Sequence, residues 1–257
     1  MKQNDKDVVY GQTTVNQLVV SDYRVADVFR RYGISFCCGG NLPLEDVCRI
    51  QSLDHTLVQE EIKKVTAPSP FRGTFMYDDW SCHFLIDFIN NVHHKYLRQS
   101  LPIAVEYAGH LERTHGNKYP ILASLSELTV RLCTETENHI SQKETVIFPY
   151  IKQLANAYEK KESYAGLLVR TLKKPVANLL DVEHRYLNHL LQEVSELTNN
   201  FIPPPGSCLT HKVCFAKLAD VHYNLEQLLY LENRVLFPKA SMMEKACLGV
   251  EPTSHMG

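Results

Sequence analysis

Apolar residues recur at helical spacing over most of the chain, and runs in which apolar and polar residues alternate are nearly absent. The second part of the chain has four long segments of this kind, interrupted by glycine, proline or clusters of charge. Four long helices with short connections favour an antiparallel four-helix bundle, so the chain is predicted to be all-α. The predicted helices cover about residues 80–110, 119–158, 165–199 and 208–245.

Residues 13–65 have shorter apolar repeats, which predict a small domain of short helices. One of these helices is expected to start after an N-cap at Ser21 or Asp22, since short polar side chains favour that position. Pro43 is expected to open the next helix, and a further helix is expected over residues 53–65. The first of these helices carries an apolar stripe of Val25, Val28, Phe29 and Tyr32.

The sequence TAPSPFRGTF, at residues 66–75, contains two prolines and one glycine and is the best candidate for a linker. It divides the chain into a small helical domain at residues 1–65 and the four-helix bundle at residues 76–257. Two domains agree with a length of 257 residues.

Composition excludes some classes of protein. The net charge is −2, so no strong field favours nucleic acid or a membrane surface. No apolar run approaches the roughly 20 residues that span a bilayer, and the first residues lack the apolar core of a signal peptide. A cytoplasmic protein is therefore expected.

The sequence contains eight cysteines, and most are expected to be reduced thiols that fill core positions. No CxxC motif is present, which disfavours a zinc finger or a thioredoxin-type site. Cys37 and Cys38 differ from the others because they are adjacent and precede Gly39-Gly40 in a turn-rich loop.

Each predicted long helix has one conspicuous polar residue on an apolar face, and these residues are separated by 45, 45 and 48 positions. In an antiparallel bundle of similar helices, such spacing can bring all four to one depth. A lone histidine on an apolar face is commonly a hydrogen-bonded core residue, but three histidines with one glutamate are a donor set for a metal ion. The four residues are His94, His139, His184 and Glu232.

An internal repeat sharpens this hypothesis. Residues 139–149 read HISQKETVIFP and residues 228–238 read LLYLENRVLFP, so the two segments align on Phe-Pro. The shared template is His-x3-Glu-x4-Phe-Pro, in which His and Glu share one helix face. The first copy has Lys143 at the glutamate position, and the second has Leu228 at the histidine position.

With these motifs in hand, the chain resembles the iron–sulfur cluster repair di-iron proteins, also called repair-of-iron-centres or ScdA-type proteins. They join a small N-terminal domain with a Cys-Cys-Gly-Gly motif to a hemerythrin-like bundle. The resemblance covers about residues 13–245. Its matching stretches are YGISFCCGG (32–40), VEHR (182–185), NNFIPPP (199–205) and LENRVLFP (231–238).

The resemblance implies a non-haem di-iron site with four histidines and two bridging glutamates. His94, His139, His184 and Glu232 match ligands, whereas Lys143 replaces a bridging glutamate and Leu228 replaces a histidine. Two of the six ligand positions are therefore lost. Together, the two losses are expected to impair one of the two iron sites more than the other.

We therefore expect a mononuclear iron site, with His94, His139 and Glu232 as a two-histidine, one-carboxylate set. His184 is then a fourth ligand or a remnant of the lost site. Glu144 is an alternative bridging carboxylate, although it lies about 100° around the helix from position 143. Two irons or a metal-free bundle are the other outcomes.

For Cys37 and Cys38, the resemblance and the adjacent thiols favour thiol chemistry, namely transient metal coordination, redox exchange or handling of nitrosyl groups. The alternative is an ordinary turn with two half-buried cysteines. Two thiols alone cannot fill a tetrahedral metal site. A further arrangement is therefore a metal site shared across a homodimer or with the bundle.

The resemblance implies that the protein helps repair iron–sulfur clusters damaged by nitrosative or oxidative stress, with damaged iron–sulfur proteins as partners. A second hypothesis is a hemerythrin-like protein that binds or senses nitric oxide or oxygen without repair activity. A third is a metal-free bundle that presents the Cys-Cys domain to a partner.

Overall fold

The computed structural model describes residues 12–37, 40–67, 76–171, 175–176 and 181–249. All regular elements in these ranges are helices, apart from one isolated bridge between Thr14 and Pro43. The predicted all-α class is therefore confirmed.

The chain divides into two compact units. One comprises residues 1–73 with 203–216, and the other comprises residues 74–202 with 217–257. Most of the predicted linker, residues 66–75, lies outside the described residues, so the predicted domain limits stay a prediction.

In the described part of residues 1–73, four short helices surround an apolar core. Phe29 and Leu18 are buried at its centre, and Tyr32 donates a hydrogen bond from its hydroxyl to Glu61. The helices are α1 (Val15–Ser21), α2 (Val25–Arg31), α3 (Leu44–Ile50) and α4 (His55–Thr66).

Local capping explains where these helices begin. Thr14 and Gln17 form a reciprocal capping box at α1, and the Asp54 carboxylate accepts hydrogen bonds from the Thr56 and Leu57 amides in the first turn of α4. Helix α3 starts directly after Pro43, as expected. The expected N-cap of α2 is wrong, because Ser21 ends α1 and α2 begins only at Val25.

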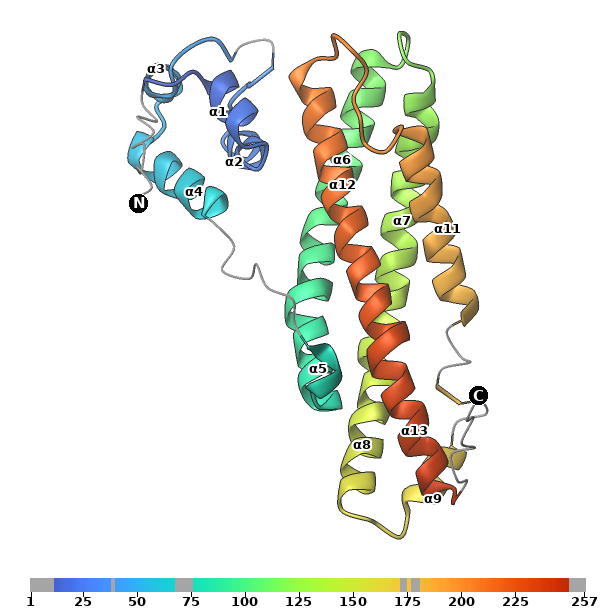
Figure 1. Ribbon diagram of the computed structural model, residues 1–257. Helices are drawn as coiled ribbons and strands as arrows, with labels where there is room; N and C mark the ends of the chain where they lie inside the picture. The colour runs from blue at the N-terminus through green and yellow to red at the C-terminus, as the bar shows by residue number, and fades with distance from the viewer. Residues whose placement is uncertain (1–11, 38–39, 68–75, 172–174, 177–180, 250–257) are drawn as a thin grey trace, which may run out of the picture. The chain divides into compact units, whose positions relative to one another are not determined.

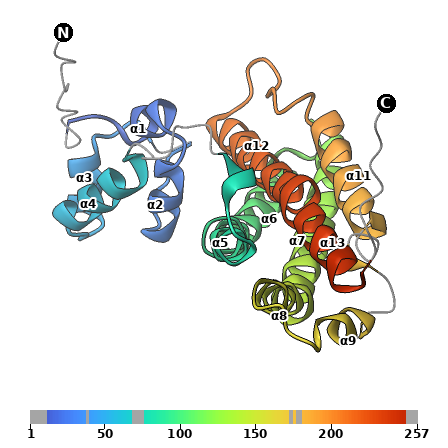
Figure 2. The same cartoon turned by 60° about the horizontal axis from the view of Figure 1, so that its bottom comes forward.

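The bundle consists of long helical rods that alternate in direction (Figure 1). Helix α6 packs against α7, and α7 packs against α11. At the lower end, α8, α9 and α13 contact one another, as Figure 2 shows. The helices are α5 (Cys82–Phe88), α6 (Lys95–His115), α7 (Ile121–Gln142), α8 (Phe148–Glu159), α9 (Ala165–Arg170), α11 (Asp181–Leu197), α12 (Leu209–Tyr230) and α13 (Phe237–Cys247).

Three of these rods contain a wider π-helical segment where they carry a residue of the candidate site. These segments are η2 (Ile89–His94), η3 (Lys143–Ile147) and η4 (Leu231–Leu236). Proline inside a helix collides with the carbonyl group four residues earlier. Segments η3 and η4 lie just before Pro149 and Pro238, so proline accounts for the wider helical turn at these two places. π-Helical turns occur frequently at functional sites.

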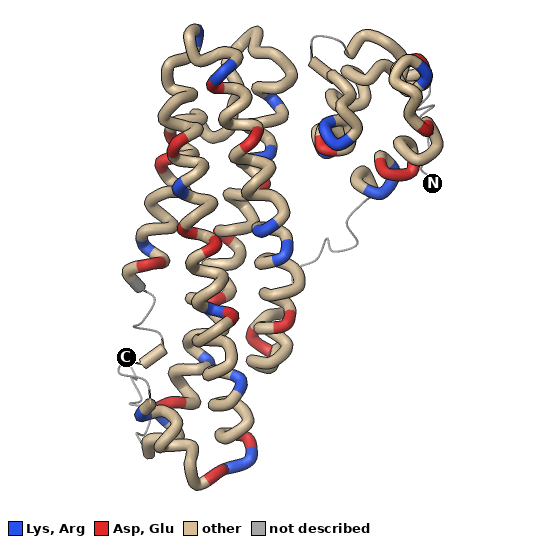
Figure 3. Tube along the Cα trace, turned by 180° about the vertical axis from the view of Figure 1, so that it is seen from behind, with Lys and Arg blue, Asp and Glu red and all other residues tan. Residues whose placement is uncertain are grey.

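Lys, Arg, Asp and Glu are interspersed along the bundle helices (Figure 3). The described helices include none that is both long and apolar enough to cross a membrane.

Candidate metal centre

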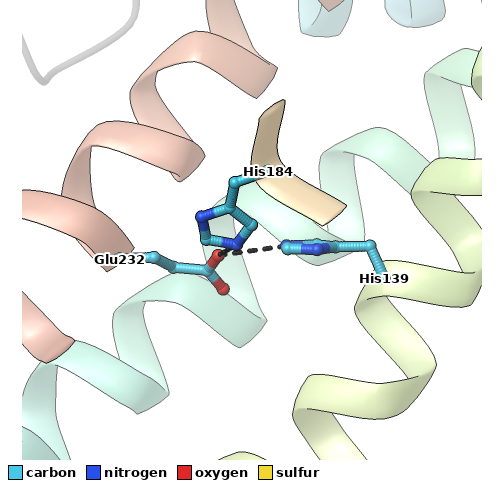
Figure 4. A group of neighbouring side chains, drawn as sticks. All are labelled: His139, His184 and Glu232. Carbon is cyan, nitrogen blue, oxygen red and sulfur yellow. Dashed lines mark hydrogen bonds and ion pairs between the residues drawn. The ribbon is translucent and has the colours of Figure 1, made fainter. Parts of the chain in front are cut away.

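Three helical rods bring His139, His184 and Glu232 together inside the bundle (Figure 4). One nitrogen or oxygen atom from each residue lies within 4.8 Å of those from the other two. His139 belongs to α7, His184 to α11 and Glu232 to η4, and all three side chains are buried. The structure therefore forms a compact set of two imidazoles and one carboxylate.

Glu232 is the centre of this cluster. Its Oε2 atom lies 3.0 Å from Nε2 of His139 and 3.1 Å from Nε2 of His184. Its Oε1 atom is buried and has no hydrogen-bond partner among the described residues. Burial opposes ionisation, but the charge and hydrogen bond of His139 outweigh it and hold the pKa of Glu232 well below its ordinary value. The carboxylate is thus anionic although it is fully buried.

His139 has a carboxylate oxygen at each ring nitrogen. Nδ1 lies 2.6 Å from Oε1 of Glu183, and Nε2 faces Glu232. Burial favours the neutral ring, but the Glu232 charge and the two hydrogen bonds together raise the pKa of His139 above its ordinary value. Without a metal, a proton on Nε2 therefore occupies the position that a metal ion would take.

His184 is oriented from its other side. Its Nδ1 atom lies 2.7 Å from Oδ1 of Asn233, which can only accept a hydrogen bond, so Nδ1 donates. In the neutral ring, Nε2 then presents a lone pair to the anionic oxygen of Glu232, and it makes no hydrogen bond. Two electron-rich atoms at 3.1 Å repel each other unless a metal ion or a proton on Nε2 lies between them.

His94 lies outside this set of three. Its Nδ1 atom is 3.0 Å from Oε1 of Glu144, and its buried Nε2 atom has no hydrogen-bond partner among the described residues. Burial lowers the pKa of His94, while the negative charge of Glu232 opposes that effect. The structure therefore gathers His184 with His139 and Glu232, whereas the mononuclear set expected from the sequence contained His94.

Lys143 occupies the position of the missing bridging glutamate and is completely buried. Its Nζ atom lies 3.1 Å from Nδ1 of His139 and 3.5 Å from Oε2 of Glu183. Burial lowers its pKa, and the charges of Glu232 and Glu183 oppose that shift. Leu228, at the missing histidine position, is also buried and has no atom that can bind a metal.

Glu144 is engaged elsewhere in this structure. One of its oxygens contacts His94, and both accept hydrogen bonds from Nη1 of Arg98 at 2.9 and 2.8 Å. These contacts oppose the alternative in which Glu144 serves as a substitute bridge.

The donor set fits a transition-metal ion. Two imidazole nitrogens and a buried carboxylate suit iron, and the unpartnered Oε1 of Glu232 and Nε2 of His184 are available as ligand atoms. A cation would also offset the cost of burying the Glu232 charge. His94 Nε2 is available to a further position, so the residues present fit non-haem iron.

Sequence reasoning missed the residues that surround the ligands. The histidines are contacted by Glu183, Asn233 and the phenylalanines of the two Phe-Pro motifs. Glu144, which was considered only as a bridging carboxylate, contacts Nδ1 of His94. A usable signal was the internal repeat, because Glu144 aligns with Asn233 and Phe148 aligns with Phe237.

Cys37 lies half-buried in the loop before α3, whereas Cys38 and Gly39 lie outside the described residues. The loop is joined to α1 by a hydrogen bond from the Asn16 amide to the Gly40 carbonyl. A Cβ atom at Gly40 would collide with the carbonyl oxygen of Phe36, so this glycine serves the packing of the loop itself.

Three of the other cysteines match the expectation of core thiols, whereas Cys133, Cys208 and Cys247 are half-buried. Cys48, Cys82 and Cys214 are buried and reduced, and burial raises the pKa of each thiol. The Cys214 pKa rises to about 12, so this thiol is an unreactive core group at neutral pH.

Comparison with known proteins gives two findings. Residues 11–66 match the family model ScdA_N, described as a domain of unknown function (DUF542). The chain is also 28% identical over 236 residues to the iron–sulfur cluster repair protein YtfE of Escherichia coli O1:K1 / APEC, covering 91% of this chain and 98% of that protein. The YtfE proteins of Escherichia coli strain SMS-3-5 / SECEC and of Escherichia fergusonii match with the same identity and coverage. The resemblance to repair-of-iron-centres proteins is therefore confirmed.

Proposed function

We propose that this protein binds one iron ion in the bundle and uses it to help repair iron–sulfur clusters damaged by nitrosative or oxidative stress. The observation that carries the proposal is the buried cluster of His139, His184 and Glu232, whose donor atoms lie within 4.8 Å of one another. The similarity to repair proteins along nearly the whole chain supports the choice of process.

His139, His184 and Glu232 would hold the iron, and His94 would provide a further ligand. Bound iron would supply either metal for a damaged cluster or open coordination positions for nitric oxide. Glu183 fixes the His139 ring at Nδ1 and thereby directs Nε2 toward the centre. The negative charge of Glu232 favours the binding of a cation at this buried position.

Lys143 and Leu228 favour one iron over two. The second site of the di-iron template would need a carboxylate and an imidazole where this chain has an amine and an isobutyl group. The Lys143 ammonium, when charged, pairs with Glu183 and interacts with Glu232, which reduces the net negative charge available to a second metal ion.

Damaged iron–sulfur proteins in the cytoplasm are the proposed partners. Cys37 and Cys38 are proposed to assist through transient metal coordination or thiol exchange. These two cysteines belong to the N-terminal compact unit, whereas the proposed iron ligands belong to the other unit. Thiol chemistry and iron binding can therefore be tested separately.

The decisive experiment combines iron analysis with a repair assay. Protein purified anaerobically should contain about one iron per chain and should reactivate an iron–sulfur dehydratase that nitric oxide has inactivated. His139→Ala should lose both properties. Two irons per chain would contradict the mononuclear site, and no iron after anaerobic Fe(II) loading would contradict the metal-based proposal altogether.

A second candidate function is reversible binding of nitric oxide or oxygen. The observation that favours it is the small ligand set, because three or four protein ligands leave coordination positions open on iron. Iron-loaded protein that forms a nitric oxide adduct but fails to reactivate the damaged dehydratase would favour this function over repair.

A further inference from the structure

Two histidines on different rods are held by the same pair of contacts. His94 stacks on Phe148 with ring centroids 5.6 Å apart and planes at 10°, and its Nδ1 contacts Glu144. His184 stacks on Phe237 at 5.8 Å and 24°, and its Nδ1 contacts Asn233.

The internal repeat accounts for this likeness. In each copy the residue that contacts Nδ1 stands four positions before the phenylalanine of Phe-Pro, so both contacts come from one helix face. Glu144 lies in η3 and Asn233 in η4, immediately after the template glutamate position in each case. The two copies thus retain the same clamp although each has lost a different ligand.

The clamp fixes which nitrogen of each histidine is available. The Asn233 oxygen and the Glu144 carboxylate accept hydrogen bonds from Nδ1, so whenever the ring is neutral its lone pair is on Nε2. Both Nε2 atoms are buried and make no hydrogen bond among the described residues. The stacked phenylalanine restricts rotation of each ring, so Nε2 is held in one direction.

The two clamps differ in charge. Asn233 offers a neutral amide oxygen, whereas Glu144 offers a carboxylate that Arg98 holds through two hydrogen bonds. A carboxylate that accepts from an imidazole N–H increases the basicity of the opposite nitrogen. Arg98 also binds Glu137 on its other side, but its own two hydrogen bonds are what hold Glu144 in place before any ligand arrives.

We propose that Glu144 and Asn233 are positioning residues that aim Nε2 of His94 and of His184 at the iron, and that Glu144 makes His94 the stronger donor. The inference rests on the proposed iron site and identifies His94 as a ligand, although it lies outside the cluster of His139, His184 and Glu232. Glu144 is thereby assigned a role that differs from a bridging carboxylate.

The test compares Glu144→Ala and Glu144→Gln with Glu137→Gln, which alters the same Arg98 network without touching His94. Fe(II) affinity is measured by competition with a chelator, and the nitric oxide adduct is recorded by electron paramagnetic resonance. Glu144→Ala should weaken iron binding by about 10–100-fold and change the spectrum. Glu144→Gln, which retains an acceptor oxygen, should fall between Glu144→Ala and the wild type, and Glu137→Gln should match the wild type.

Asn233→Asp adds an independent arm. It should strengthen iron binding, because it gives His184 the carboxylate that His94 already has, and an unchanged or weaker affinity would contradict the role assigned to the Glu144 charge. The inference is overturned if Glu144→Ala and Glu144→Gln bind iron with the affinity and spectrum of the wild type. It is also overturned if Glu137→Gln weakens binding as much as Glu144→Gln, since the effect would then belong to the surface network. A wild-type protein that takes up no iron would instead overturn the proposed function.

Discussion

The Oε2 atom of Glu232 lies 3.0 Å from Nε2 of His139, although 93 positions separate the two residues. Both side chains are fully buried, and the charge of the Glu232 carboxylate would be costly there without the imidazole or another cation beside it. This pair therefore links the packing of two rods to the chemistry of the site.

Neutralising the carboxylate should abolish tight iron binding. Glu232→Gln keeps the shape of the side chain but removes the negative charge, and an amide is a weak ligand. We expect Fe(II) affinity to fall by about 100-fold or more, beyond the cost of losing an outer hydrogen-bond partner. Competition with a chelator measures the change. His93→Gln is the matched control, because His93 is a buried neighbour of His94 that contacts Asn224 instead of the cluster. Equal losses in both variants would contradict the assignment.

Restoring the template should restore a second metal. The double variant Lys143→Glu with Leu228→His supplies the bridging carboxylate and the missing imidazole, and both positions are already buried. The iron content measured after anaerobic loading should rise from about one to about two per chain. Lys143→Glu alone should give a smaller increase, because it lacks the imidazole. A double variant that is folded and still binds one iron would show that other features limit the site.

Iron affinity should increase with pH. Because the Glu232 charge and the hydrogen bonds raise the pKa of His139, the metal-free ring carries an extra proton at pH values below that raised pKa, and iron must displace this proton. Affinity should therefore be weakest below about 6.5, the ordinary histidine value, and should rise until the pH exceeds the raised pKa. Isothermal titration in buffers of different ionisation enthalpy measures the protons released. Affinity that is independent of pH would contradict the protonation state inferred for His139.

A buried carboxylate at the far end of the bundle should contribute strongly to stability. Glu244 accepts a hydrogen bond from the Tyr150 hydroxyl at 2.8 Å and another from the Val176 amide at 3.3 Å. Glu244→Ala leaves two buried donors unpaired, so we expect a loss of about 2–4 kcal/mol in the free energy of unfolding. Tyr150→Phe removes one hydrogen bond and should cost about 1 kcal/mol. Urea denaturation of the iron-free protein measures both, and similar losses would contradict the prediction.

The adjacent thiols should be required for repair but not for the iron site. Replacing Cys37 and Cys38 by serine should abolish reactivation of a nitric oxide-damaged dehydratase, since serine neither exchanges disulfides nor binds iron as thiolate does. Iron content and thermal stability of the bundle should stay as in the wild type. Cys133→Ser, at a half-buried thiol of α7, is the control and should leave repair intact. Unchanged repair in the double variant would contradict the thiol role.

Local sequence determined much of this protein. The helical period of the apolar residues predicted the all-α class, and prolines and glycines marked most of the breaks between elements. The polar residue on the apolar face of each long segment singled out His94, His139, His184 and Glu232, and the resemblance matched these four to metal ligands. These features could be read from the chain because they depend on neighbours three or four residues apart.

Only the tertiary structure decided how those residues are grouped. The packing of the helices places His184, and not His94, in the cluster with His139 and Glu232. The same packing places the Glu144 carboxylate against Arg98. It also brought Glu183 and Asn233 to the far nitrogens of the histidines. Sequence spacing gives the face of a helix but not the rotation and depth at which two helices meet. The ring orientations that decide which nitrogen can bind a metal depend on those contacts across the bundle.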